Sequence, residues 1–493
     1  MSSSITIESP SISIPCPSKP KNPTQHGFPG SGVSLEMYNM PERNAISRDS
    51  ISRTQNLESL PPSNHESTRS SPPGPMVDQM QTIWEPYKNR FRVLATSLTA
   101  LSNGMNDSAN GALIGSIEKY PYPSLYGTVS TIFLCNALGF IVAAFFVSSM
   151  SQRLGRAKTL IISEVFLMFG YVIIVTTPSF GVVAISYLLL GIGMAINLAI
   201  GQVYCANLAN NTVILGLYQG AYGIGGTMAP LIATSMVSRG YLWSRFYIIL
   251  LSIAAFNLFF AAWAFWGYEK HEDESDPALP PPASEQSNRN QFSTTPGRRW
   301  SSMKTLLTNK ATVFGALFIF AYQGAEVSIS GWVISFLVQF RNGDPTKVGY
   351  VTSGFWAGIT LGRFTLSFLA HNMGERSFVF IVTAGALVLE IIVWFVRSIP
   401  GDSVAVAFSG LLLGPIYPAA VHIFQRLIPK KMQISSLSLI GSVGTSGGAI
   451  APFMTGMIAQ KAGTFVLHPI CIGLFAIMAV TWWMLPEPER KSE

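Results

Sequence analysis

The sequence predicts an all-α membrane protein in which twelve transmembrane helices form two pseudo-symmetric halves of six helices each. Three observations lead to this fold class. The chain has 493 residues, of which 48% are hydrophobic and only 12% are charged, whereas soluble globular proteins carry about 25% charged residues. The apolar residues are gathered into runs of about twenty, the length that crosses a bilayer as a helix. The two halves of the chain also repeat each other. A soluble enzyme and a fully disordered chain are both excluded by this composition.

Polar segments divide the chain into its parts. Residues 1–84 are rich in Ser, Pro and Asn, lack periodic apolar positions and are predicted to be a disordered cytosolic tail. A second polar stretch, 268–310, contains acidic residues, prolines and arginines and is predicted to be a cytosolic linker. Residues 486–493 are predicted to be a short cytosolic C-terminal tail.

Twelve apolar spans lie between these polar segments. The first six make up an N-terminal half, 85–267, and are predicted at 91–117, 123–149, 158–177, 180–207, 211–237 and 243–267. The other six make up a C-terminal half, 311–485, and are predicted at 311–340, 346–370, 376–396, 402–427, 433–459 and 464–485. Gly and Pro occur inside these spans, which transmembrane bundles tolerate.

The Lys and Arg residues between the spans predict the orientation. If the N-terminus is inside, the inward connections and the linker hold sixteen of these residues and the outward connections hold seven. Basic residues accumulate in cytoplasmic loops, so both termini are expected in the cytosol. The plasma membrane is favoured, and an organelle membrane is the alternative. Because these residues form no cluster on a polar domain, no nucleic-acid partner is expected.

Glycine motifs recur at a nearly constant spacing in the two halves. The stretch 225–231 (GGTMAPL) matches 447–453 (GGAIAPF) at an offset of 222 residues. Gly104 in the first span matches Gly324 in the seventh at an offset of 220 residues. Duplication of a six-helix unit explains these matches. Two similar halves of this kind can rock about a central site near the midplane of the membrane.

The connection after the second span carries a basic motif, 148–158 (SSMSQRLGRAK). This motif resembles the loop signature Gly-x-Leu-Ala-Asp-Arg-x-Gly-Arg-Lys of the major facilitator superfamily, and the wider resemblance covers residues 85–485. Arg153, Gly155 and Arg156 match the signature, whereas Gln152 stands where the signature has Asp. The resemblance implies the superfamily fold and a gating role for the three matching residues. Simple anchoring by positive charge is the alternative role.

Two further motifs narrow the resemblance. A Gly-Ala pair precedes Glu326, and Gly331-Trp332 follows it in the seventh span, while 414–418 reads GPIYP in the tenth. These motifs resemble fucose-permease-type members of the superfamily and the fungal branch named for bypass of stop codons. The resemblance implies uptake of a sugar-like or other polar solute.

Two carboxyl groups inside the spans are the leading site residues. An ionisable group inside the membrane costs roughly 2.5–3.5 kcal/mol on insertion scales and is therefore a candidate functional group. Asp107 in the first span and Glu326 in the seventh lie in matching helices of the repeat. We expect a polar central site in which one carboxyl binds the coupling proton and both contact the solute. A structural carboxyl bound to neighbouring amides is the alternative.

Other polar and aromatic side chains are supporting candidates. Asn103, Asn106 and Asn110 share a helical face with Asp107, because their spacing follows the helical period. The remaining candidates for hydrogen bonding to a polar solute or stacking on a ring are Asn136, Asn197, Gln202, Tyr222, Gln323, Trp332 and Trp356.

Three further ionisable residues are expected to have structural roles. Arg363 lies near the inward end of its span and is predicted to reach the membrane interface as an anchor. Glu390 and His422 are predicted to be isolated within their spans, and a part for His422 in proton coupling is the alternative.

The sequence contains no phosphate-binding loop, no HExxH motif and no nucleophile elbow. No enzymatic activity, ATP-driven pumping or bound cofactor is therefore expected. The expected function is secondary active transport of a small organic solute by alternating access, driven by a proton gradient, with sodium as the alternative ion. Export or organellar transport of a fungal secondary metabolite is a second hypothesis. A nutrient receptor that signals through its tail is a third, and unchanged flux after deletion of residues 1–84 would reject it. The expected partners are the solute and the bilayer, and a monomer is expected.

Overall fold

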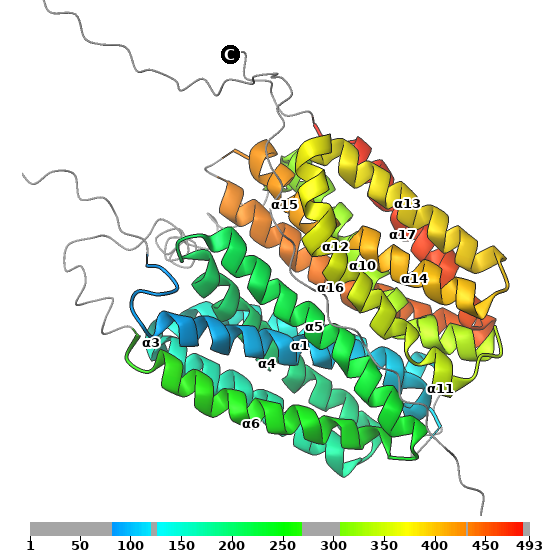
Figure 1. The fold of residues 1–493 in the computed structure, drawn as a ribbon, viewed down its shortest axis with the longest axis horizontal. Coiled ribbons are helices and arrows are strands. Elements are labelled where there is room, and N and C mark those ends of the chain that lie inside the picture. Colours follow the sequence, from blue (N-terminus) through cyan, green and yellow to red (C-terminus); the bar gives the residue numbers. More distant parts are fainter. Residues whose placement is uncertain (1–80, 120–125, 269–305, 430–431, 487–493) are drawn as a thin grey trace, which may run out of the picture. The chain divides into compact units, whose positions relative to one another are not determined.

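The computed structural model describes residues 81–119, 126–268, 306–429 and 432–486 (Figure 1). Nearly all of the predicted tails and linker lie outside these ranges. All the described residues fall in one compact unit, which contains both sets of helices.

The N-terminal half begins with a long helix and contains one helix that is broken in the middle. Its elements are α1 (Asn89–Ile117), α2 (Tyr126–Val129), α3 (Thr131–Thr176), α4 (Phe180–Ala206), α5 (Asn211–Ser238), η1 (Trp243–Arg245) and α6 (Phe246–Phe265). The backbone of α3 leaves the helical conformation at Gly155, where φ is 77°. Glycine adopts this positive φ without a steric penalty. The break therefore separates two membrane helices at the connection that the sequence predicts.

The C-terminal half follows the same plan. Its elements are α10 (Lys310–Gln339), α11 (Pro345–Val348), α12 (Val351–Met373), α13 (Glu375–Phe395), α14 (Ile399–Leu413), α15 (Ile416–Leu427), α16 (Gln433–Ala462), η2 (Thr464–Val466) and α17 (Leu467–Trp483). The predicted span 402–427 is divided between α14 and α15. Pro415 lies at this division, and its ring nitrogen cannot donate the hydrogen bond that would continue the helix.

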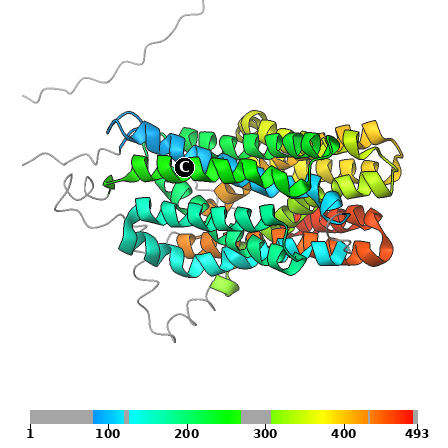
Figure 2. The same ribbon diagram turned by 90° about the horizontal axis from the view of Figure 1, so that it is seen from below.

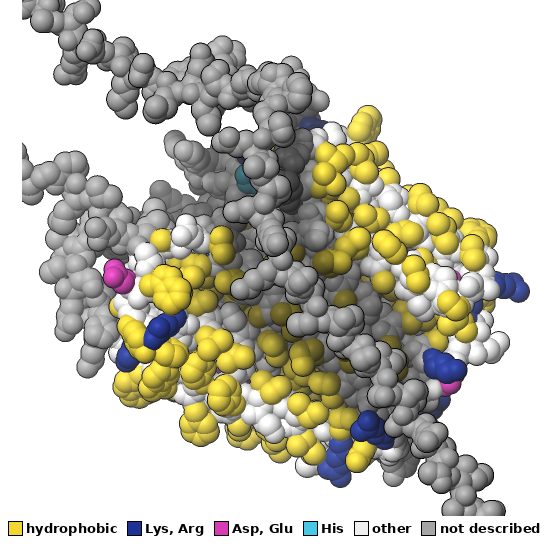
Figure 3. Space-filling model, in the orientation of Figure 1, with side chains coloured by type: hydrophobic (Ala, Val, Ile, Leu, Met, Phe, Trp, Pro, Cys, Tyr) yellow, Lys and Arg dark blue, Asp and Glu magenta, His cyan; other side chains and the backbone are white. Residues whose placement is uncertain are grey.

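The long helices correspond one to one to the twelve predicted spans once α3 is divided at Gly155 and α14 and α15 are taken together. Eight helical segments of the described residues are long and apolar enough to cross a membrane. The more polar helices α1, α5 and α12 are also long enough, at 29, 28 and 23 residues. Figure 3 shows hydrophobic side chains covering the visible face of the described helices, with most Lys and Arg near the helix ends. The protein is an all-α membrane protein.

Glycine contacts within each half bring helix backbones together, and the repeat uses them twice. A Cβ atom on Gly104 of α1 would lie 2.0 Å from the carbonyl oxygen of Tyr222 on α5. In the other half, a Cβ atom on Gly447 of α16 would lie 2.1 Å from the carbonyl oxygen of Phe320 on α10. Small residues allow this approach between membrane helices. The matched glycines of the sequence therefore mark matched helix pairs.

The two halves lie side by side (Figures 1 and 2). Hydrogen bonds join them where α1, α5, α10 and α16 end, which we call the predicted outer end. The Thr234 hydroxyl on α5 donates a hydrogen bond to the Gly349 carbonyl, which precedes α12, over 3.0 Å. The backbone N–H of Gly127 donates to Oε1 of Gln460 near the end of α16 over 3.1 Å. These bonds join the halves at both sides of this end.

Candidate functional site

Asp107 lies near the middle of α1 and contacts α5. Its carboxylate accepts a hydrogen bond from the Tyr222 hydroxyl over 2.5 Å. The carboxyl is only half-buried, whereas its neighbours on the helix, Asn106 and Ser108, are fully buried. Asp107 has no ion-pair partner among the residues that the structure describes. Among the described residues, the negative charge of Asp107 is therefore stabilised directly by one neutral donor, the Tyr222 hydroxyl.

Glu326 lies on α10, the helix that matches α1 in the repeat, and its environment differs. Oε1 of Glu326 lies 3.9 Å from the guanidinium of Arg363 on α12. Glu326 is 7% exposed, and Tyr322, one helical turn before it, interacts with both charged groups. The prediction that Arg363 anchors at the interface is therefore wrong, because a buried carboxylate holds its side chain inside the bundle. An arginine within an apolar span already pointed to such a partner.

The two carboxyls lie close enough to interact electrostatically, and aromatic residues fill the space beside them. The Trp356 ring on α12 lies 5.9 Å from the Tyr222 ring, centroid to centroid. Its Nε1 donates to the Ser330 hydroxyl on α10 over 2.8 Å. The structure thus brings Asp107, Glu326, Tyr222 and Trp356 together from four helices, two of each half.

The three amides of the α1 stripe point into the N-terminal half. The Asn103 side-chain amide donates to the Met194 carbonyl on α4, and that of Asn106 donates to the Met194 sulfur over 3.1 Å. The Asn110 oxygen accepts from the Tyr187 hydroxyl over 3.0 Å. These predicted solute ligands are therefore separated from Asp107 by the direction of their side chains. The reason is that one helical face is wide enough to contact both α4 and α5.

The remaining predicted solute ligands lie in several places. Asn136 packs against Gly191 of α4, and Gln323 packs against Gly444 and Gly448 of α16. The Trp332 ring nitrogen donates to the Pro452 carbonyl over 2.9 Å. Gln202 is exposed near the end of α4, whereas Asn197 is fully buried between α3 and α4.

A further buried carboxyl, that of Glu164, is not among the predicted site residues. Glu164 lies on α3 after the break and has no exposed surface. Its Oε1 accepts a hydrogen bond from the Asn197 amide over 3.0 Å. The signal was available, because an acidic residue stands inside the predicted span 158–177.

Comparison with known proteins identifies the family to which this arrangement belongs. A family model described as Major Facilitator Superfamily matches residues 96–452, and a second match covers 328–493. The chain belongs to the major facilitator superfamily. The resemblance seen in the sequence is thereby confirmed, and so is the class of membrane transporter.

Similar proteins and a similar structure agree with this membership. The superfamily protein is 25% identical over 419 residues to Bypass of stop codon protein 6 from Saccharomyces cerevisiae, covering 81% of this chain and 83% of the yeast protein. It is 23% identical over 296 residues to a nitrite extrusion protein of Bacillus subtilis, covering 56% of this chain and 67% of that protein. The crystal structure of a D-xylose-proton symporter matches with a TM-score of 0.64 at 12% identity, covering 82% of this chain and 99% of that chain. The fold is therefore the superfamily fold.

In this superfamily member, we call the segment from Arg153 to Lys158 the gating loop after its predicted role, and the break at Gly155 shapes it. Arg156 lies over the ring of Tyr268 with its guanidinium carbon 4.4 Å from the ring centroid. Arg92 of α1 lies over the same ring at 4.5 Å, whereas Arg153 is exposed. The gating loop and the start of α1 thus share one aromatic contact at the end of α6.

Two further ionic contacts correct the prediction that Glu390 and His422 are isolated. Nδ1 of His468 on α17 lies 2.7 Å from Oε1 of Glu390 on α13, and both residues are 1% exposed. Nδ1 of His422 lies 2.5 Å from Oε1 of Glu375. The partners are distant in sequence, so only the tertiary structure brings them together.

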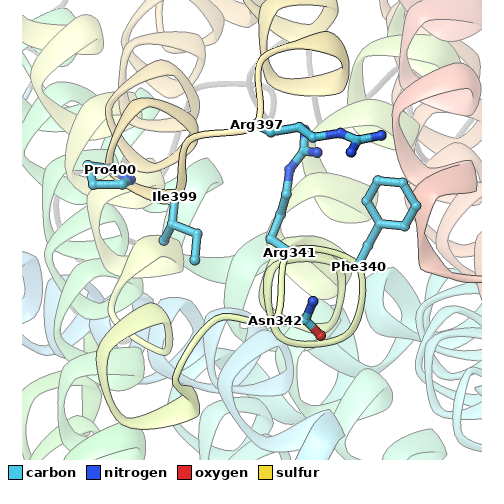
Figure 4. A pocket seen from close by; sticks show the side chains of 6 residues that line it. All are labelled: Phe340, Arg341, Asn342, Arg397, Ile399 and Pro400. Carbon is cyan, nitrogen blue, oxygen red and sulfur yellow. The ribbon is translucent and has the colours of Figure 1, made fainter.

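A pocket of about 530 Å³ lies at the predicted outer end of the C-terminal half (Figure 4). It is lined by Phe340, Arg341, Asn342, Arg397, Ile399 and Pro400. Arg341 is held by Asp402, whose Oδ2 lies 3.1 Å from its Nε. Arg341 also lies fifteen residues beyond Glu326 on the helical axis, or about 22 Å at 1.5 Å per residue. The pocket is therefore separate from the carboxyl site.

Proposed function

We propose that the protein is a proton-coupled transporter that moves a small polar organic solute by alternating access. The observation that carries this proposal is the pair of interacting carboxyls, Asp107 and Glu326, on matching helices of the two halves. Solute sites of duplicated transporters lie near the midplane between the halves. A pair of carboxyls there provides one group for the proton and one for the solute.

Asp107 is the proposed proton-binding residue. A half-buried carboxylate inside the membrane without a cation is costly, and protonation removes that cost. The Tyr222 hydroxyl stabilises the charged form through one hydrogen bond. Both forms are therefore accessible, which a group that binds and releases a proton in each cycle requires.

Glu326 is the proposed solute ligand and acts together with Arg363. Their atoms are 3.9 Å apart, a separation at which each charged group keeps capacity for further hydrogen bonds. Hydroxyl groups of a polar solute fit this pair, and the Trp356 ring beside it offers an apolar face for stacking. A sugar-like solute is favoured for this reason. The proposed energy source is the proton gradient, with no bound cofactor.

The proposed orientation places both termini in the cytosol, in the plasma membrane or an organelle membrane. The excess of Lys and Arg in the inward connections supports it. Protease protection of tags added to either terminus in sealed vesicles would test it.

The test of the proposal is flux through the full-length chain in proteoliposomes, screened with sugars, organic acids and hydrophobic metabolites. For the solute that is transported, Asp107→Asn should abolish accumulation driven by a pH gradient and retain exchange of labelled for unlabelled solute. Glu326→Gln should weaken solute binding at least tenfold in both assays, because one charged ligand is lost. Accumulation by Asp107→Asn at the rate of the unaltered protein would reject proton coupling at this residue.

A further inference from the structure

The observation that leads further is the environment of Glu164, which the central site does not use. Its side chain has no exposed surface. The Ser163 hydroxyl donates to the Asn197 oxygen over 2.5 Å, so the amide group of Asn197 is directed at Oε1 of Glu164. The second oxygen, Oε2, is buried and has no hydrogen-bond partner within the described part of the chain.

No cation compensates for this carboxyl. Among the described residues, no Lys, Arg or His forms an ion pair with Glu164, and the one polar group that contacts it is a neutral amide. An uncompensated carboxylate inside an apolar bundle is strongly disfavoured relative to the neutral acid. A proton on Oε2 would remove the charge and would supply a donor.

Two amide side chains of α1 contact α4 close to Asn197. Asn103 and Asn106 donate to Met194, one helical turn before Asn197. The side-chain oxygens of both amides are buried and lack donors within the described residues. Buried oxygens of this kind are normally satisfied by ordered water or by a mobile donor. Buried polar atoms without hydrogen-bond partners among the described residues thus gather on α1 and α3, and they include hydroxyls of Ser102 and Tyr171 as well as these amide oxygens.

Tyr171 connects this region to the central site. It interacts electrostatically with Glu164 on its own helix and with Asp107 on α1, and its buried hydroxyl has no hydrogen-bond partner among the described residues. The other ionisable group that acts on Tyr171 is Tyr187 on α4. The ionisable groups that act on Tyr171 from α1, α3 and α4 are therefore Asp107, Glu164 and Tyr187, none of which is a cation.

We propose that Glu164 is a second proton-binding residue of the transport cycle, joined to Asp107 by Tyr171 and the α1 amides. This inference rests on the proposed function, because it gives the proton of Asp107 a route within the N-terminal half. Glu164 lies nine residues beyond Gly155, or about 14 Å along the helix. The route would lead from the central site toward the end of the bundle that carries the gating loop, apart from the solute.

The test is infrared difference spectroscopy during a pH titration of the full-length protein in lipid vesicles, with the proton itself as the probe. The carbonyl stretch of a protonated carboxyl should report Glu164, disappear in Glu164→Gln and return at a shifted frequency in Glu164→Asp. Asp107→Asn should keep this band and move its titration midpoint by about one pH unit, the interaction expected of coupled sites. Glu390→Gln, which alters another buried carboxyl, should leave both the band and its midpoint unchanged.

The outcomes separate this inference from the proposed function. If Glu164→Gln removes no band that titrates, Glu164 does not bind a titratable proton and the inference is wrong. If the band is lost but Asp107→Asn leaves its midpoint in place, the connection to Asp107 is wrong. Failure of Asp107→Asn to alter transport would instead reject the proposed function. Thermal unfolding of each variant would show that the fold is retained.

Discussion

Three buried glutamates among the described residues, Glu164, Glu326 and Glu390, have different partners, and the partner limits what each residue can do. Glu390 is paired with His468 at 2.7 Å, a geometry that holds both groups in place. Glu326 and Arg363 are 3.9 Å apart, too far for a direct hydrogen bond between them. Glu164 accepts a hydrogen bond from the neutral Asn197 amide, so neutralising it requires a proton. We therefore propose that residues of one chemical type serve as a structural link, a binding group and a proton carrier.

Truncating Glu390 should destabilise the C-terminal half. Glu390→Ala leaves the His468 imidazole buried without its partner, and removing one member of a buried pair costs about 3–5 kcal/mol. The measurement is thermal unfolding in detergent. Replacing both residues with apolar side chains, as in Glu390→Leu with His468→Phe, should recover much of the loss. Equal melting temperatures for Glu390→Ala and the unaltered protein would contradict a stabilising pair.

Glu118, at the predicted outer end of α1, should make stability depend on pH. Burial raises the pKa of this carboxyl from 4.5 to about 8, and the neighbouring Lys119 opposes the shift. Because the folded pKa lies above the unfolded value, the stabilising contribution is complete below about pH 4.5 and is lost as pH rises through about 8. Glu118→Gln should remove this part of the decline. Identical melting temperatures against pH for both proteins would show that Glu118 does not contribute.

At the scale of helices, backbone contact through glycine is the feature that both halves repeat. Gly225 of α5 would place a Cβ atom 2.0 Å from the Leu101 carbonyl, the counterpart of the Gly104 contact from the opposite side. Gly191 of α4 and Gly410 of α14 make equivalent contacts with the helices beside them, at 2.0 and 2.2 Å. Helices that touch through their backbones cannot separate slightly without losing many contacts at once.

A methyl group at one of these contacts should therefore destabilise the bundle. Gly104→Ala forces α1 away from α5, and such overpacking typically costs 1–3 kcal/mol. Gly115 lies on the same helix, and a Cβ atom there would meet nothing within 4 Å. Gly115→Ala is thus the matched control and should leave the melting temperature unchanged or raise it slightly. A similar effect of the two substitutions would show that the contact does not matter.

The helices and their pairing were largely predictable from the sequence, whereas the direction of individual side chains was not. Hydrophobic runs and repeated glycines fix which segments cross the membrane and which approach closely, because both depend on local composition. Whether Asn106 faces α4 or the central site depends on a rotation of α1 by less than one residue, which no periodicity resolves. The pairing of Arg363 with Glu326 required two helices to be placed side by side. Partners for Glu390 and His422 were unpredictable for the same reason.

At the scale of the whole molecule, hydrogen bonds join the two halves at the predicted outer end. Side chains make these bonds, as in the contact of Thr234 with Gly349 and of Gly127 with Gln460. Nearer the middle of the bundle the halves also touch through backbone, because a Cβ atom on Gly111 of α1 would lie 2.0 Å from the Ser330 carbonyl oxygen on α10. Side-chain contacts can break and re-form without disturbing a helix pair. The proposed alternating access therefore requires the side-chain contacts at the predicted outer end to break.

A disulfide across this end should stop transport reversibly. A Cβ atom on Gly349 would lie 2.4 Å from the Thr234 methyl carbon, so paired cysteines at these positions are near enough to bond. Thr234→Cys with Gly349→Cys should lose nearly all flux when oxidised and regain it after reduction, because alternating access requires this end to open. Each single variant is the control. Full flux in the crosslinked protein would mean that this end does not open.

The ring of Tyr268, held between Arg92 and Arg156, has a mechanical consequence. It follows α6 and is the last described residue before the segment 269–305. Its ring contacts both the helix that carries Asp107 and the segment 153–158. A displacement of this end of α6 would therefore act on α1 and on the segment 153–158 together.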